Sequence, residues 1–401
     1  MKTRHTYIIL AVVFASFFAL GMPDGAFGVA WPSIRGEMGQ PLERAGIAVL
    51  IHSFFYALTS SLLGRISGFV KLEKIALIGA ATMALGFFGV SLAPNFAAFA
   101  LIIAPVGVGM GMVDSSLNSY VVKSFTSRHL NWLHCFWGLG AATTPLLMTQ
   151  MILTFGWRTG YIVIAAAQGA IALTFLTTLL KGIWAKVESG RATSTQATDR
   201  KRYLIKKRHQ FMAIASCFLY GGVEYSIGFW ITSVLLESRG FGLERVGMYP
   251  AVYFASITGG RMVFGFIANK FSDTAIIRFG FSLSIAGLLI LFLTGNIFGM
   301  ALAGLGFAPI FPCIMHDNSN RFDPKIVTKL VGYEVAAIGA GVAILSALIG
   351  QVLSRVSLEA LFPISIALAA ITLLLNESLA LTAKRNGTLV AVSADKDGEG
   401  I

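Results

Sequence analysis

Long apolar stretches separated by short polar loops run along almost the whole chain. They occupy twelve ranges: 7–34, 44–64, 74–92, 96–122, 132–154, 157–181, 210–236, 245–268, 274–295, 297–316, 329–353 and 358–381. Each range approaches or exceeds the roughly 20 apolar residues with which a helix crosses a bilayer. The pattern predicts an all-α membrane protein with twelve transmembrane helices.

Composition supports this prediction, because 56% of the residues are hydrophobic and only 12% are charged. Soluble domains are usually about 25% charged. The first apolar stretch follows Lys2 and Arg4 and continues past the length of a signal peptide without a clean cleavage site, so we expect it to be retained. Cys135, Cys217 and Cys313 all fall inside apolar stretches and are expected to be core residues, not disulfide or zinc ligands.

The net charge of +12 is unevenly placed, since most of the 31 Lys and Arg residues fall in alternate loops. The opposite loops hold only Arg35, Arg44, Arg158, Arg239, Arg245 and Arg355. Basic loops usually stay in the cytoplasm. We therefore expect a multi-pass protein of the cell (inner) membrane with both termini cytoplasmic.

One long polar interruption divides the chain. It predicts an N-terminal six-helix bundle at 1–182, a cytoplasmic linker at 183–209 and a C-terminal six-helix bundle at 210–382, followed by a disordered cytoplasmic tail at 383–401. The linker is basic, and contact with anionic lipid explains this better than binding of nucleic acid. Membrane lipid is therefore an expected partner, and nucleic acid is not.

The two halves repeat each other. Residues 21–28 and 221–228 share the form G-x-x-acid-x-x-x-G, and residues 42–46 return at 243–247. Further matches pair Gly64 with Gly265, and Gly140-Ala141 with Gly339-Ala340. Repeats in register at nearly one offset indicate two parallel six-helix units related by an axis along the membrane normal, an architecture of secondary transporters.

Several motifs carry a family resemblance over about 7–382. Gly156-Trp157-Arg158 resembles the GWR element of the major facilitator superfamily, and the loops at 64–74 and 265–274 resemble its G-x-x-x-D-R/K motif. The resemblance implies the major facilitator fold, with two pseudo-symmetric bundles and a monomer as the working unit. The first loop lacks the Asp, which weakens the expectation of the family's usual salt-bridge latch between the halves.

A narrower likeness is to the fucose permease and sugar porter branch of this superfamily. It rests on Asp24, Asp114, the run Phe136–Ala141 and the run Phe307–Pro312. The likeness implies import of a sugar coupled to protons or sodium. The G-P-x-x-G-G pattern of drug antiporters is not visible in the fifth stretch, which also favours import.

Ionisable residues inside the apolar stretches are candidates for coupling, because a charged side chain at the bilayer centre costs roughly 2.5–3.5 kcal/mol. The residues predicted to carry the proton are Asp24, Asp114, Glu224, Glu334 and His134. The helix is expected to be broken or kinked at Pro23, beside Asp24. Structural alternatives remain open: a kink that packs helices closely with Asp24 hydrogen-bonded to a neighbouring span, an interhelical polar cluster at Asp114, and an exposed ion pair between Glu334 and Lys329.

Other polar and aromatic residues near these positions are candidates for solute contact. The predicted substrate-binding residues are Asn118, His52, Tyr56, Trp137, Tyr220, Tyr225 and Trp230. Amide and acid groups bind hydroxyls, and aromatic rings stack on sugars. Arg261 is expected to pair with an acid as a gating latch.

The sequence favours a gradient-driven transporter over an enzyme, because it contains no H-E-x-x-H, G-x-S-x-G or P-loop motif. Our hypothesis is a proton-coupled symporter of a small polyhydroxylated solute, a sugar or sugar derivative, that works by alternating access. No cofactor or metal is expected, and sodium remains open as the coupling ion. The alternatives are a proton antiporter exporting a small amphipathic molecule and a receptor or scaffold without flux.

Overall fold

The computed structural model describes residues 2–125, 127–184, 207–267, 270–322 and 324–385. The first half forms α1 (Lys2–Glu37), α2 (Arg44–Ile66), α3 (Leu72–Ser91), α4 (Phe96–Ser124), α5 (Ser127–Phe155) and α6 (Trp157–Leu180). The second half forms α7 (Lys207–Ser233), α8 (Leu243–Val246), α9 (Met248–Ile267), α10 (Asp273–Thr294), α11 (Ile297–Phe307), α12 (Ile310–Arg321), α13 (Pro324–Arg355) and α14 (Leu361–Arg385). A π-helical turn, η2 (Val234–Ser238), extends α7, and a 3₁₀ turn, η4 (Leu358–Ala360), precedes α14.

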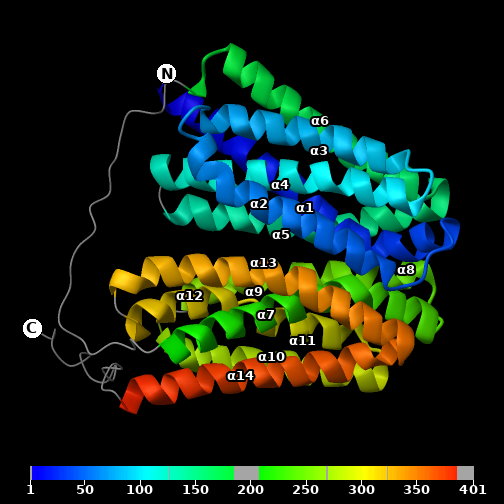
Figure 1. Ribbon diagram of the computed structural model, residues 1–401, viewed down its shortest axis with the longest axis vertical. Helices are drawn as coiled ribbons and strands as arrows, with labels where there is room; N and C mark the ends of the chain where they lie inside the picture. Colours follow the sequence, from blue (N-terminus) through cyan, green and yellow to red (C-terminus); the bar gives the residue numbers. More distant parts are fainter. Residues whose placement is uncertain (1, 126, 185–206, 268–269, 323, 386–401) are drawn as a thin grey trace, which may run out of the picture.

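These helices stack as two layers, one built by α1–α6 and the other by α7–α14 (Figure 1). The all-α, two-bundle prediction is confirmed. Within the described ranges, ten stretches are long and apolar enough to cross a membrane. The two predicted spans that fall short of this criterion, α5 and α9, pack against each other between the layers. Their lower hydropathy fits a position shielded from lipid.

Two predicted helix boundaries differ from the structure. The span expected at 297–316 is two helices, α11 and α12, which meet at Pro309. Conversely, α1 runs unbroken from Lys2 to Glu37 with Pro23 and Pro32 inside it, so of the break or kink expected at Pro23 the break is wrong. A proline removes one backbone donor, and the packing of a long helix can outweigh that loss.

Close helix crossings recur in the two halves. A β-carbon at Gly140 of α5 would overlap the backbone carbonyl of Phe18 of α1, and one at Gly341 of α13 would overlap the carbonyl of Phe218 of α7. Gly341 therefore occupies the place in the second half that Gly140 occupies in the first. A β-carbon built at Gly339 has no heavy atom of another described segment within 4 Å. The predicted match of Gly140 with Gly339 thus has the wrong register.

We call the end where α1 begins and α14 ends the termini end, and the opposite end the far end (Figure 1). At the far end the halves touch through small residues, because Gly46 lies against Ala347 and Gly247 lies against Thr149. An ion pair between Arg35 of α1 and Glu237 of η2 also joins the halves there. The far end is therefore closed by direct contacts between the bundles.

Each bundle is also fastened at its far end by an arginine. Arg158 at the start of α6 donates to Glu37 at 2.8 Å and to the carbonyls of Ser91 and Ala93 at 2.8 and 3.0 Å. Arg239, which follows η2, donates to Glu359 at 2.6 Å. It also donates to the carbonyls of Leu291 and Phe292 at 3.0 and 2.8 Å. We call these two groups the far-end clamps.

The remaining structural predictions concern cysteines and connecting segments. Cys217 and Cys313 are buried, Cys135 is partly exposed, and all three are free thiols. Most of the predicted linker, 185–206, and most of the predicted tail, 386–401, lie outside the described residues.

Candidate functional site

A cavity with about 430 Å³ of empty space, part of it open to solvent, lies mainly within the first bundle. It is lined by Pro23, Asp24 and Phe27 of α1, Ala48, Val49 and His52 of α2, Phe87 of α3, Ile103 and Val106 of α4, Tyr161 of α6 and Tyr225 of α7. Three residues predicted from the sequence, Asp24, His52 and Tyr225, are therefore brought together. Among the described lining residues, α7 alone contributes from the second bundle, so this cavity lies off the axis between the halves.

Asp24 is held against α5. Its Oδ2 accepts a hydrogen bond of 3.1 Å from Nε1 of Trp137, another predicted site residue. A β-carbon at Gly21, one turn before Asp24, would overlap the carbonyl of Trp137, so the small residue lets the two helices approach. The Asp24 carboxylate thus faces a cavity and has a neutral donor as its hydrogen-bond partner.

Asp114 forms a second acidic position with Tyr56 and Asn118. The Tyr56 hydroxyl donates to Oδ2 at 2.6 Å, and Nδ2 of Asn118 donates to Oδ1 at 2.9 Å. Asp114 and Asn118 are four residues apart and so share one face of α4. Nε2 of His52, on α2, lies 3.2 Å from Sδ of Met110, on α4. The His52 ring also stacks on the Tyr56 ring. This is the interhelical polar cluster that the sequence left open, with His52 linking it to the cavity wall.

Glu224, the counterpart of Asp24 in the second half, has a different environment. Oε1 of Glu224 lies 3.4 Å from Nη2 of Arg261, and the Tyr220 hydroxyl donates to Oε2. The Tyr253 hydroxyl donates to the backbone carbonyl of Glu224 at 2.9 Å. Arg261 therefore pairs with an acid as predicted, although the pair joins α7 to α9 within one bundle.

Three further predicted residues lie away from the cavity lining. Trp230 is fully buried, and its Nε1 donates to the carbonyl of Ser346 at 3.1 Å. His134 is exposed and packs edge-on against Phe17 with 5.8 Å between ring centroids. Glu334 is fully buried.

The buried carboxylate of Glu334 has one polar neighbour on α12. Asn318 donates to Oε2 of Glu334 at 2.6 Å, while Oε1 has no hydrogen-bond partner among the described residues. Lys329 instead places its ammonium 5.6 Å from the centroid of the Tyr333 ring. The alternative of an exposed ion pair between Glu334 and Lys329 is therefore wrong.

Sequence reasoning missed three aromatic residues of the cavity: Phe27, Phe87 and Tyr161. The Phe87 and Tyr161 rings stack with 6.0 Å between their centroids. Tyr161 follows Trp157 of the GWR element by one helical turn, which was the available signal. Phe27 and Phe87 belong to a sequence rich in phenylalanine, and nothing in the pattern distinguishes them.

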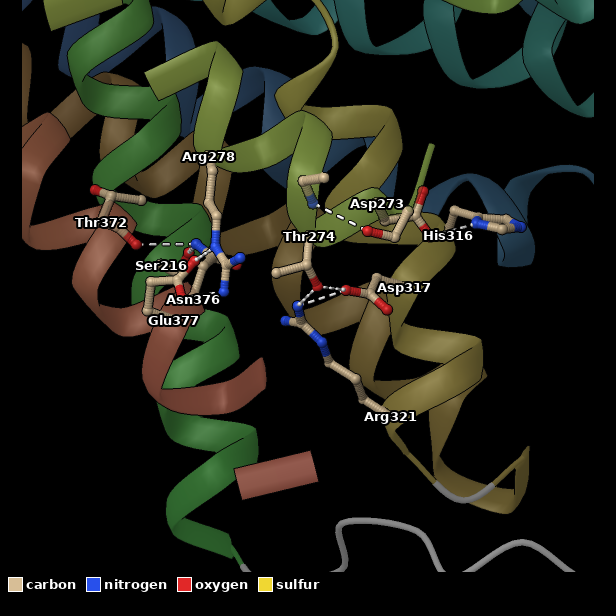
Figure 2. A network of polar contacts seen from close by, with 12 residues as sticks. Ser216, Asp273, Thr274, Arg278, His316, Asp317, Arg321, Thr372, Asn376 and Glu377 are labelled. Atoms are coloured by element: carbon tan, nitrogen blue, oxygen red, sulfur yellow. Dashed lines mark hydrogen bonds and ion pairs between the residues drawn. The ribbon is translucent and has the colours of Figure 1, made fainter. Parts of the chain in front are cut away.

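A separate polar network lies at the termini end of the second bundle (Figure 2). Arg321 pairs with Asp317 on α12 and reaches Thr274 on α10. Arg278 on α10 donates to both oxygens of Glu377 on α14 at 2.5 and 2.7 Å. Further contacts in the same region join Asp273 to His316, and Asn376 to Ser216 and Thr372. Because each contact joins neighbouring helices or successive turns, the network fixes the packing of this bundle.

Comparisons with known proteins agree with this architecture. The "Probable sulfoacetate transporter SauU" of Cupriavidus necator is 24% identical over 67% of this chain, which spans 66% of that protein's length. The "Cis,cis-muconate transport protein" of Acinetobacter baylyi is 24% identical over 69% of this chain and 70% of its own. A crystal structure of the nucleoside transporter NupG has a TM-score of 0.75 at 12% identity, covering 93% of this chain and 99% of that one.

The structural likeness shows the fold, and the relatives are membrane transporters, not enzymes. Residues 12–333, most of the chain, match the family described as the Major Facilitator Superfamily. The GWR element, the repeated halves and the two-bundle architecture all agree with that match. The chain therefore belongs to the major facilitator superfamily of transporters.

Proposed function

We propose that this transporter is a proton-coupled symporter of a small, uncharged, polyhydroxylated solute, working by alternating access in the cell inner membrane with both termini in the cytoplasm. The observation that carries the proposal is Asp24, a carboxylate that lines a cavity and accepts from a neutral indole. A buried acid without a compensating cation favours its neutral form. Proton binding at Asp24 would therefore lower the cost of closing the transporter around its solute.

The chemistry of the cavity supports a hydroxylated solute. Its lining combines the acid Asp24 with the hydroxyls of Tyr161 and Tyr225 and the rings of Phe27 and Phe87. Hydroxyl groups of a solute can donate to the acid while its carbon skeleton packs on the rings. Among the described lining residues there is no Lys or Arg, so a fixed positive charge for an anion is missing from the wall.

A second candidate is symport of a small organic anion with protons. Two relatives are named for sulfoacetate and cis,cis-muconate transport, and both named compounds are small anions at neutral pH. An anion in this cavity would meet the charge of Asp24 unless a proton neutralised it. This candidate therefore also makes Asp24 the coupling residue, and only the solute differs.

Proteoliposomes with an internal pH dye test both candidates. We expect D-xylose, L-fucose or erythritol to carry protons inward when added outside, and to accumulate under an inward proton gradient. Proton entry driven only by sulfoacetate or cis,cis-muconate would replace the polyol with the anion. Solute-driven proton exit would indicate the antiporter, and accumulation that follows sodium at fixed pH would make sodium the coupling ion.

A further inference from the structure

Two tyrosines that line the cavity differ in their hydrogen bonding from the tyrosines beside the buried acids. The hydroxyls of Tyr56, Tyr220 and Tyr253 each donate to a carboxylate or a backbone carbonyl. Tyr161 and Tyr225 line the cavity, and their hydroxyls have no hydrogen-bond partner among the described residues. Neither hydroxyl oxygen belongs to the fully buried atoms that lack a partner, so each is accessible to water or to a solute in the cavity.

Tyr161 is the more firmly placed of the two. Only 2% of its surface is exposed, and its ring lies between Phe87 and Trp157 with 6.0 Å between centroids on each side. Trp157 in turn donates to Glu37 at 2.6 Å, which ties this wall to the far-end clamp. Since the ring cannot turn without disturbing these contacts, the hydroxyl is held at the cavity.

Three polar residues of this wall line the same cavity: Asp24, Tyr161 and Tyr225. A carboxylate accepts hydrogen bonds, whereas a tyrosine hydroxyl both donates and accepts. Such a set complements adjacent solute hydroxyls, each of which can donate to one oxygen while accepting from another.

We propose that Tyr161 is a specificity-determining residue that, with Tyr225 and Asp24, binds a pair of neighbouring hydroxyls on the solute. This inference rests on the proposed function and narrows it to solutes with a vicinal diol. Phe27 and Phe87, on the same cavity, face the carbon atoms beside that diol. The second bundle lacks the feature, because the residue 200 positions after Tyr161 is Leu361.

The test compares erythritol with 1,4-butanediol, which has the same carbon chain and terminal hydroxyls but lacks the vicinal pair. Uptake of both labelled probes is measured in proteoliposomes for the wild type, Tyr161→Phe, Tyr225→Phe and Tyr249→Phe. Tyr249→Phe is the matched control, because its hydroxyl donates to the carbonyl of Gly295 at 2.6 Å and the residue does not line the cavity. Thermal unfolding midpoints verify that each variant is folded.

We expect the wild type to prefer erythritol by about 100-fold in kcat/KM, since a site built to bond a hydroxyl rejects the analogue that lacks it. Tyr161→Phe should raise KM for erythritol about tenfold and reduce the preference to about tenfold, because one hydrogen bond is lost while the ring remains. Tyr225→Phe should act in the same direction, and Tyr249→Phe should retain the wild-type values.

Two outcomes would overturn the inference, and they are distinguishable. If the wild type transports erythritol and Tyr161→Phe keeps its KM and its preference, the role of Tyr161 is wrong while the proposed function stands. If the wild type transports sulfoacetate but neither erythritol nor D-xylose, the diol assignment fails together with the proposed solute class.

Discussion

The two acids that the internal repeat places 200 residues apart, Asp24 and Glu224, have different polar partners. Asp24 accepts from the neutral indole of Trp137 and faces a cavity. Glu224 pairs with the cation Arg261. Duplication thus retained an acid at both positions but supplied a compensating charge only in the second half. A paired carboxylate resists protonation, whereas an unpaired buried one accepts a proton more readily.

The comparison assigns different work to the bundles. The first bundle holds the cavity, Asp24 and the cluster around Asp114. The second bundle holds an acid neutralised within the same bundle and a network of ion pairs at its termini end (Figure 2). We infer that coupling and solute recognition belong mainly to the first bundle, because Glu334 of the second bundle, also a buried acid bonded to a neutral donor, does not line the cavity.

The largest expected effect is from Asp24→Asn, which removes the titratable group and keeps the size of the side chain. A gradient of about one pH unit can support about tenfold accumulation through one coupled proton, because one unit corresponds to roughly 1.4 kcal/mol. We expect the variant to equilibrate the solute without accumulating it. Uptake and counterflow of erythritol in proteoliposomes measure the two properties separately.

The matched variant in the second half is Glu224→Gln. The contrast between the two acids predicts that Asp24→Asn and Glu224→Gln differ in gradient-driven accumulation. We expect Glu224→Gln to retain gradient-driven accumulation, because its partner Arg261 already neutralises the acid. Loss of accumulation in Glu224→Gln with retention in Asp24→Asn would reverse the assignment of coupling to the first bundle.

The next effect concerns the stability of the Glu224–Arg261 pair. Arg261→Gln alone leaves Glu224 without its cation, and Glu224→Gln leaves Arg261 without its acid. Removing one partner of a buried pair costs up to about 3–5 kcal/mol, and we expect about 2 kcal/mol for this partly exposed one. The double variant Glu224→Gln/Arg261→Gln should unfold at a higher temperature than either single variant. Equal additive losses would show that the pair contributes no coupling energy.

The sequence predicted the spans and the repeat well because hydropathy and small-residue spacing depend on local properties of the chain. It singled out Asp24, His52 and Tyr225 as separate site candidates because polar residues inside a membrane span are often functional, and the structure brings these three to one cavity while Asp114 and Glu224 do not line it. Tyr161 was missed because an aromatic residue on an apolar helix has the same pattern whether it faces lipid or a cavity.

The environment of Glu334 shows why other site details required coordinates. Its buried carboxylate accepts from Asn318 on α12, the helix that begins after Pro309. The sequence places Pro309 between apolar residues but does not determine how the second helix segment is directed. The equivalence of Gly140 with Gly341 was likewise ambiguous, since Gly339 lies only two residues away and the register is decided by contact with Phe218.

The smallest expected effect is at the far-end clamps, which perform the same task with exchanged chain positions. In the first bundle α1 supplies the acid Glu37 and α6 supplies Arg158, whereas in the second Arg239 follows η2 and η4 supplies the acid Glu359. Both arginines also bind carbonyls near the end of one helix of their bundle, α3 at Ser91 and α10 at Leu291. Ser91 and Leu291 are 200 residues apart, as the repeat requires, whereas Arg158 and Arg239 are not counterparts.

This exchange predicts that the polarity of the first clamp can be reversed. Arg158→Glu should lower the unfolding midpoint in detergent, because it removes contacts worth about 1–3 kcal/mol and places two acids together. Adding Glu37→Arg should recover part of the loss, since in the second bundle Arg239 binds the corresponding carbonyls from the segment that follows the first helix of that bundle. Recovery should be incomplete, because Trp157 then loses the carboxylate to which it donates. If Arg158→Glu/Glu37→Arg is no more stable than Arg158→Glu, an arginine can reach the carbonyls of Ser91 and Ala93 only from α6. The two clamps would then make similar contacts but could not exchange the positions of their acid and arginine.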